Sequence, residues 1–189
     1  MDTAVLVEPI HEASPRLLAR IAGALYFFSL LAALLLEVLF PGRFDIPAGL
    51  IQISGMLVVT LILYTLFKPV KGSIALLAAA SNLAGLAVEA IRVNAHGADI
   101  AMVFHGVFCI LTGYLIARSA FLPRILGALI AFGGLTWLTY PLAPFAHYLA
   151  PYNLICGLAG EASVFFWLLI MGVNAQGWKE QAGTGRKWL

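Results

Sequence analysis

The chain has 189 residues, of which 62% are hydrophobic and only 11% are charged, and its mean hydropathy is +0.96. Soluble globular domains are about 45–50% apolar and about 25% charged, so this composition excludes a water-soluble domain and predicts an integral membrane protein. The formal net charge is +2, and the basic residues are scattered over short loops instead of forming a nucleic-acid-binding patch.

The N-terminal segment, residues 1–16, precedes the first apolar stretch and contains Asp2, Glu8 and Glu12. A cleaved signal peptide begins with a basic region and ends in a small-residue cleavage site. Neither feature is found at the start of this chain. We therefore expect residues 1–16 to remain as a cytoplasmic segment ahead of a retained helix.

Six apolar stretches follow, each near the length of about 20 residues that a helix needs to cross a bilayer. They cover residues 17–40, 48–67, 72–95, 98–119, 121–145 and 151–174. Their apolar residues are continuous and do not alternate with polar ones, which excludes the strands of a membrane barrel. Connections containing Pro and Gly separate them. The sequence predicts an all-α, polytopic fold, with a compact bundle of six transmembrane helices over residues 17–175 and a cytoplasmic tail over residues 176–189.

The basic residues predict the orientation of the bundle. With the N-terminus in the cytoplasm, only Arg43 and Arg92 of the eleven Lys and Arg residues fall on the outer side. The others fall on the cytoplasmic side: Arg16, Arg20, Lys68, Lys71, Arg118, Arg124, Lys179, Arg186 and Lys187. Cytoplasmic loops of membrane proteins carry such an excess of positive charge. We expect a multi-pass protein of a bacterial inner membrane with both termini in the cytoplasm.

Ionisable residues within or beside the apolar stretches are the candidates for a substrate-binding or proton-binding site, because a charge is costly to place in lipid. They are Glu37, Glu89, Arg92, His105 and Glu161. With a rise of about 1.5 Å per residue, all five map to the outer half of the bilayer. Glu161 lies deepest among the acids. The sequence thus predicts a polar cluster near the outer side, with Gln52, Ser54 and Asn153 near its rim.

Helical spacing places several of these residues on common faces. Ser81, Gly85, Glu89 and Arg92 share one face, His105, Cys109 and Thr112 a second, and Gly157 and Glu161 a third. Simpler interpretations stay open for each candidate. Glu89 and Arg92 are placed to form a salt bridge within one helix, Glu37 is close enough to the surface to be solvated, and His105 is equally suited to an interhelical hydrogen bond.

Cofactor binding is left open by the sequence. A His with carboxylates can bind zinc or iron, but no spaced His motif is present, so no metal site is predicted. His105 is a candidate single axial ligand for haem. Cys109 and Cys156 both lie in apolar stretches and are expected to be small packing residues instead of a disulfide.

Several short motifs resemble those of a bacterial domain-of-unknown-function family of six-helix integral membrane proteins. They are Arg20 to Tyr26 with Glu37, Phe104-His105-Gly106, Gly113-Tyr114-Leu115, Phe121 to Gly127, Gly160-Glu161, Trp167, and Gly172-Val173-Asn174. The similarity covers most of residues 16–175. It implies a fold of six helices and brings no activity, substrate or cofactor.

Three functions are consistent with this pattern. The first is a binding or transport protein for a small molecule, in which Glu161 and His105 couple binding to protons. The second is an accessory or structural subunit of a larger membrane complex, whose partners are other membrane subunits as well as the lipid bilayer. The third is a membrane enzyme that uses His105 and a glutamate as acid and base on a lipid or a quinone. No nucleic-acid partner is expected.

Overall fold

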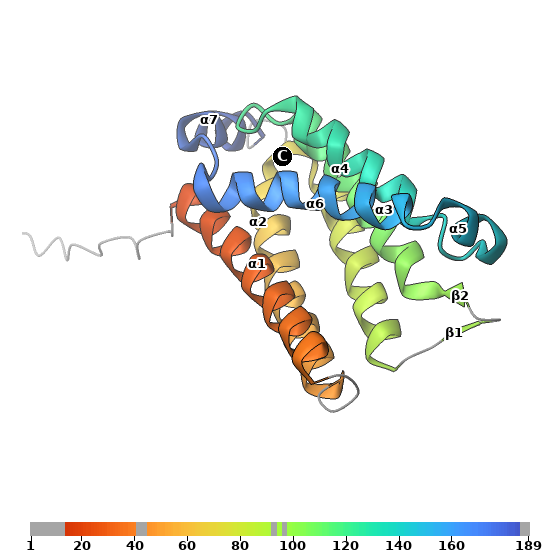
Figure 1. Cartoon of the computed structure of the whole chain (residues 1–189). Helices are drawn as coiled ribbons and strands as arrows, with labels where there is room; N and C mark the ends of the chain where they lie inside the picture. Colours follow the sequence, from red (N-terminus) through yellow and green to blue (C-terminus); the bar gives the residue numbers. More distant parts are fainter. Residues whose placement is uncertain (1–13, 41–44, 92–93, 96–97, 186–189) are drawn as a thin grey trace, which may run out of the picture.

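The computed structural model describes residues 14–40, 45–91, 94–95 and 98–185, which are helical apart from one short hairpin (Figure 1). The elements are α1 (Pro15–Leu39), α2 (Asp45–Ala90), β1 (Asn94–Ala95), β2 (Ala98–Asp99), α3 (Ile100–Arg118), α4 (Arg124–Trp137), α5 (Ala143–Leu149), α6 (Tyr152–Ile170) and α7 (Ala175–Gly185). The two strands pair antiparallel within the connection predicted between the third and fourth stretches. The predicted all-α fold class is confirmed.

Helices α1, α2, α3 and α6 are long and apolar enough to cross a membrane, by length and composition. The fifth predicted stretch, 121–145, is not one helix. It divides into α4, which has 14 residues and ends at Trp137, and the separate short helix α5. Pro141 and Pro144 lie at this break, and proline cannot donate the backbone hydrogen bonds that would continue α4. Six crossings therefore stay a prediction, whereas the helical membrane-protein architecture is established.

Helix α2 contains the second and third predicted stretches and is bent back on itself. Lys71 has non-helical backbone angles, two residues after Pro69, whose missing N–H already weakens the helix there. Asn82 Nδ2 donates a hydrogen bond to Thr60 Oγ1 over 2.7 Å. In a straight helix these residues would be about 33 Å apart. The two arms of α2, residues 45–70 and 72–90, therefore lie side by side (Figure 1).

Glycine pairs bring α3 and α4 into close contact. A Cβ on Gly113 would lie 2.5 Å from the Gly127 carbonyl oxygen, and one on Gly127 would lie 2.5 Å from the Gly113 oxygen. Gly106 and Gly134 form a second pair of the same kind. A Cβ on Gly106 would lie 2.8 Å from the Gly134 carbonyl oxygen, and one on Gly134 would lie 2.7 Å from the Gly106 oxygen. Small residues of this kind drive helix association in lipid, where packing replaces the hydrophobic effect.

Helix α6 packs against α1 and α4 (Figure 1), and its end is fixed to the start of α1. Arg20 donates to the Ile170 carbonyl over 3.0 Å, and Arg16 donates to the Met171 carbonyl over 3.3 Å. The two arginines belong to α1, and their side chains reach the C-terminal end of α6, where unpaired carbonyls and the helix dipole favour a positive charge.

The predicted C-terminal tail forms α7, which packs against the bend of α2. Trp178 Nε1 donates to the Leu66 carbonyl over 2.9 Å. Gln181 accepts a hydrogen bond from the Ala120 N–H over 3.0 Å, which joins α7 to the connection between α3 and α4. The tail is therefore helical as far as Gly185 and is docked on the bundle through Trp178 and Gln181.

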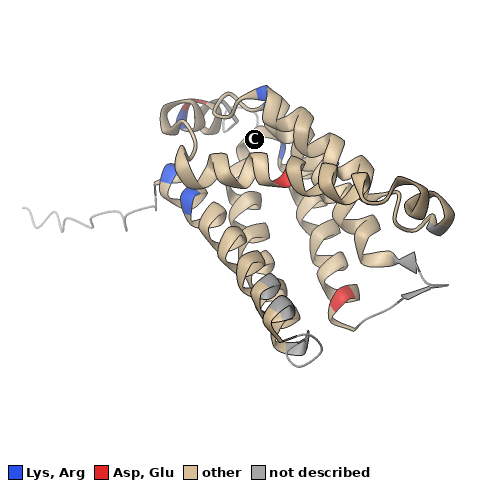
Figure 2. Cartoon of the chain, viewed as in Figure 1, with Lys and Arg blue, Asp and Glu red and all other residues tan. Residues whose placement is uncertain are grey.

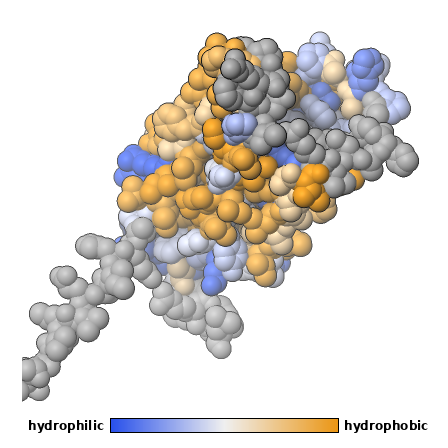
Figure 3. Space-filling view, turned by 90° about the horizontal axis from the view of Figure 1, so that it is seen from below, coloured by the Kyte–Doolittle hydropathy of each residue, from blue (hydrophilic) through white to orange (hydrophobic). Residues whose placement is uncertain are grey.

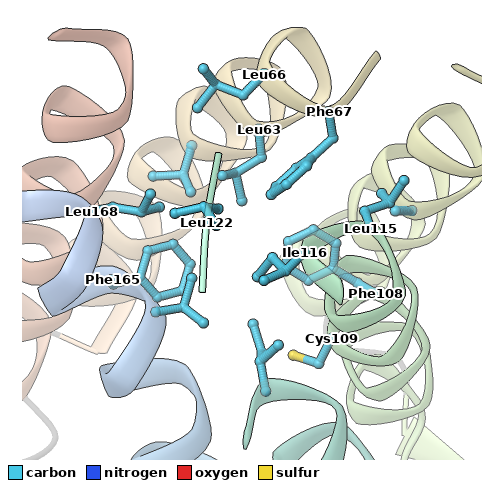
Figure 4. Close-up of a cluster of buried hydrophobic side chains, with 14 of the residues drawn as sticks. Leu63, Leu66, Phe67, Phe108, Cys109, Leu115, Ile116, Leu122, Phe165 and Leu168 are labelled. Carbon is cyan, nitrogen blue, oxygen red and sulfur yellow. The ribbon is translucent and has the colours of Figure 1, made fainter. Parts of the chain in front are cut away.

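The core of the bundle is a cluster of buried apolar side chains from α1, α2, α3, α4, α6 and the segment before α4, part of which is shown in Figure 4. Large apolar side chains are also exposed along the outer faces of the helices, including Phe28, Leu61, Leu76 and Phe166. Apolar residues cover much of the face shown in Figure 3. Such a surface is costly in water and suits lipid, so the chain is a membrane protein.

Basic residues gather at one end of the bundle, where α1 and α4 begin and where α7 lies (Figure 2). This is the charge asymmetry on which the orientation prediction depends.

Candidate functional site

Glu161 lies in the middle of α6 and is the centre of a buried polar cluster. Its residue is 3% exposed. Carboxylate Oε2 accepts a hydrogen bond from the Tyr26 hydroxyl on α1. Oε1 accepts one from Trp137 Nε1 at the end of α4 over 2.5 Å, and it lies 2.9 Å from His105 Nε2 on α3. Helices α1, α3 and α4 thus each contribute one polar side chain that contacts the carboxylate of Glu161 on α6.

The face of α6 around Glu161 is shaped for two aromatic rings. Gly157, one turn earlier, has no side chain, and a Cβ there would lie 2.6 Å from Trp137 Cε2. Phe165, one turn later, stacks on the Tyr26 ring with the centroids 3.7 Å apart. The i−4 and i+4 neighbours of Glu161 therefore position the indole and the phenol that donate to it.

His105 is oriented by a chain of hydrogen bonds that ends at a backbone carbonyl. Thr60 Oγ1 donates its only proton to the Met56 carbonyl over 2.6 Å, so it accepts from Asn82 Nδ2. The amide of Asn82 is thereby oriented with Oδ1 toward His105 Nδ1, at 3.2 Å. An amide oxygen only accepts. His105 Nδ1 consequently carries a proton.

The second ring nitrogen of His105 faces two acceptors. Nε2 lies 2.9 Å from Glu161 Oε1 and 3.7 Å from Cys109 Sγ, one turn along α3. A hydrogen bond between Nε2 and a carboxylate oxygen needs one proton between them. The pair therefore holds a shared proton, and the two groups form an ion pair when that proton is on the imidazole.

A cavity with a volume of about 110 Å³ adjoins this cluster. Residues from α1, both arms of α2, α3, α4 and α6 line it. They are Tyr26, Ser29, Leu30, Gln52, Met56, Asn82, Gly85, Leu86, Glu89, Ala101, Met102, His105, Trp137, Leu158 and Glu161. The polar cluster is thus in contact with a space that accommodates several waters or a small molecule.

The structure brings together two of the five predicted site residues, His105 and Glu161, in direct contact. Glu89 is half-buried and lines the same cavity. Arg92 and the side chain of Glu37 lie outside the described residues, and so does the predicted Glu89–Arg92 salt bridge.

Of the three residues predicted near the rim, Gln52 lines the cavity. Ser54 lies instead on a separate apolar groove between α1 and α2. Asn153 donates to Thr139 Oγ1 and to the Ala146 carbonyl, both over 3.4 Å, and so holds the α4–α5 connection against α6.

Sequence reasoning missed Tyr26, Asn82 and Trp137. Asn82 carried a usable signal, because an amide within an apolar stretch needs a partner as much as an ionisable group does. Tyr and Trp are common in membrane helices, and near a helix end they normally indicate the lipid interface. Nothing in the sequence separates Tyr26 and Trp137 from that ordinary use.

Three groups in the described residues are placed to hold a metal ion together. Donor atoms of His105, Cys109 and Glu161 all lie within 4.8 Å of one another. Asn82 and Glu161 engage the two ring nitrogens of His105. Both cysteines are free thiols, as expected.

The fold and the site define a helical membrane protein with a polar cluster buried at the convergence of α1, α3, α4 and α6. Residues 85–172, which include His105, Trp137 and Glu161, match the family described as Domain of unknown function (DUF4386). An uncharacterized protein of Archaeoglobus fulgidus is 28% identical over 152 residues, which cover 76% of this chain and 93% of the relative. No solved structure matches the chain. The predicted resemblance to a family of unknown function is confirmed.

Proposed function

We propose that the protein is a membrane binding or transport protein whose cavity accepts a small molecule with an apolar body and a cationic head, of the alkylamine type. The observation that carries this proposal is the composition of the cavity wall. Glu161 and the rings of Tyr26 and Trp137 line one part of it, Glu89 is a second carboxylate of the wall, and apolar side chains form much of the rest. Of the three functions that the sequence left open, this geometry favours the first.

The charged groups of the wall favour a cation. Glu89 and Glu161 both line the cavity, and no Lys or Arg is found among its described lining residues. A carboxylate offers about four lone-pair positions. Three of those on Glu161 are used by Tyr26, His105 and Trp137. The remaining position accepts a donor from the cavity, such as an ammonium N–H.

The uncharged part of the wall favours an apolar body. Leu30, Met56, Leu86, Met102 and Leu158 line the cavity. Met side chains adapt their shape to different ligands. The rings of Tyr26 and Trp137 offer π faces, which attract an ammonium group placed over them.

In this proposal the cavity serves the outer side of the membrane, with both termini in the cytoplasm. The gathering of basic residues at the end where α1 begins supports that orientation (Figure 2). Glu89, near the C-terminal end of α2, is then close to the outer surface. A ligand entering from outside meets Glu89 before it reaches Glu161.

The test uses primary alkylamines of increasing length, from methylamine to hexylamine, with the n-alcohols and carboxylates of equal length as controls. Thermal unfolding of the full chain is followed in mild detergent with a chelator present. A ligand at 100 times its Kd stabilises the native state by about 2.7 kcal/mol. We expect stabilisation by the amines, weaker stabilisation by the alcohols and none by the carboxylates.

Two variants sharpen this test. Glu89→Gln is expected to weaken the binding of amines without affecting alcohols. The substitution removes the negative charge of Glu89, which attracts an ammonium group and not a neutral hydroxyl. Leu76→Gln, on an exposed face away from the cavity, is the matched control. Equal effects of amines and carboxylates, or no effect of any of these compounds, would exclude the proposal.

A further inference from the structure

The His105–Cys109–Glu161 cluster contains a donor set of which the proposed function uses only Glu161. His105 and Cys109 are four residues apart on α3, so both side chains leave the same face of one helix. Glu161 Oε1 on α6 faces them, and the three donor atoms lie within 4.8 Å of one another. Cys109 is fully buried and Glu161 is 3% exposed. These are N, S and O ligands of the kinds that bind zinc.

We propose that His105 Nε2, Cys109 Sγ and Glu161 bind one zinc ion and leave a fourth coordination position open to the cavity. The site does not depend on the alkylamine proposal, because it requires only that the three donors stay together.

Two of the three donor separations are close to those of a tetrahedral ion, and the third needs a larger movement. With Zn–N near 2.0–2.1 Å and Zn–S near 2.3 Å, tetrahedral angles place N and S about 3.5 Å apart and N and O about 3.3 Å apart. The observed separations are 3.7 Å for Nε2 to Sγ and 2.9 Å for Nε2 to Oε1. These two separations differ from the tetrahedral values by a few tenths of an ångström. The third pair, Cys109 Sγ and the Glu161 oxygen, lies within 4.8 Å and has to close by side-chain rotation to the roughly 3.6 Å of a tetrahedral site.

The groups around the donors are those that orient metal ligands. A histidine ligand normally donates its other ring N–H to a carbonyl or carboxylate, which exposes the remaining nitrogen to the metal. Asn82 Oδ1 performs this role for His105 Nδ1. The carboxylate of Glu161 is held by Tyr26 and Trp137. The lone pair of Nε2 is thus directed at the place where Glu161 and Cys109 converge.

An open fourth position distinguishes this arrangement from a closed structural zinc site. Structural sites have four protein ligands, whereas catalytic sites have three and keep one for water or substrate. His105 and Glu161 both line the cavity, so a bound ion would be reached from it. Zinc would replace the proton shared by His105 and Glu161 and the thiol proton of Cys109, and both protons would leave to solvent.

The test uses the full chain in mild detergent after removal of metals with a chelator. Cobalt(II), a spectroscopic substitute for zinc, is titrated first and then displaced with zinc. We expect one cobalt per chain, a thiolate-to-cobalt charge-transfer band in the near ultraviolet, visible bands of four-coordinate intensity, and loss of all of them on addition of zinc. A wild-type protein without the thiolate band would overturn the proposal, and this result needs no variant.

Variants assign the ligands. Cys109→Ala is expected to abolish the thiolate band and to weaken zinc binding at least about tenfold, and Asn82→Ala to weaken it by about 10–100-fold through the loss of ligand orientation. Cys156→Ala, which removes the other free thiol, is the matched control and keeps the wild-type spectrum. Zinc affinity unchanged in Cys109→Ala, or a thiolate band lost in Cys156→Ala, would overturn the assignment. The alkylamine test contains a chelator, so the two proposals fail independently.

Discussion

His105 Nε2 lies 2.9 Å from Glu161 Oε1, although the two residues are 56 positions apart and belong to different helices. Removing two ionisable groups from water costs several kcal/mol each, and mutual attraction offsets this cost only when the other hydrogen-bonding positions are filled. Tyr26, Trp137 and Asn82 fill them. Within the described residues, every buried side-chain N and O atom has a hydrogen-bond partner. The surrounding helices therefore satisfy the hydrogen-bonding groups of the buried His105–Glu161 pair.

The orientation of His105 depends on Asn82, and replacing this residue tests the relay. Asn82→Leu leaves the Nδ1–H of His105 without its acceptor and removes the donor to Thr60 Oγ1, which keeps its bond to the Met56 carbonyl. An unsatisfied buried polar group costs about 1–3 kcal/mol, so we expect the free energy of unfolding, measured by SDS titration in mixed micelles, to fall by that amount. Thr65→Val removes only an exposed bond to the Leu61 carbonyl and is expected to have little effect. Equal stability of Asn82→Leu and wild type would contradict the relay.

Gly157 is the position at which a single methyl group should disturb the site. In Gly157→Ala the new Cβ meets the Trp137 ring, and the indole has to move away from Glu161. Overpacking of this kind costs about 1–3 kcal/mol, and we expect a lower thermal unfolding midpoint. Gly49→Ala, whose Cβ would meet nothing within 4 Å, is the matched control. If both alanine variants unfold alike, Trp137 does not occupy the position described.

The predicted orientation is tested by labelling introduced cysteines in a Cys156→Ser background. Gly183→Cys lies in α7 on the predicted cytoplasmic side, and Tyr148→Cys lies in α5 on the predicted outer side, where the native residue is 82% exposed. A membrane-impermeant maleimide is expected to label Tyr148→Cys in intact cells and Gly183→Cys only after lysis. The reverse pattern would invert the bundle and place the cavity on the cytoplasmic side.

Much of the fold could be predicted because lipid imposes a simple rule on composition and length. The bend of α2 at Lys71 falls in the connection expected between the second and third stretches, although the helix continues to Val70. The end of α4 could not be placed, because apolar residues continue past Trp137 and conceal the break that precedes α5. Hydropathy indicates whether a segment lies in lipid or in water, and it does not show where the hydrogen bonds of a helix end.

The ionisable residues of the site were predicted, because a charge is costly to place in lipid, whereas its uncharged residues were missed. His105 and Glu161 were candidates because an ionisable group in lipid needs a partner. Their contact follows from the packing of α4 against both α3 and α6, which the sequence does not encode locally. The close α3–α4 contact depends on Gly106 and Gly113 meeting Gly134 and Gly127, and each glycine alone is unremarkable. The aromatic donors Tyr26 and Trp137 became visible only once the helices were packed.

A double-mutant cycle on His105 and Glu161 tests the central claim most directly. The free energies of unfolding of wild type, His105→Gln, Glu161→Gln and the double variant are measured by SDS titration with a chelator present. Because the two side chains share a buried proton, each single change leaves the other without its partner. We expect a coupling energy of about 1–3 kcal/mol, the double variant losing less stability than the sum of the single changes. Additivity within about 0.5 kcal/mol would show that the pair is not coupled and would contradict the account.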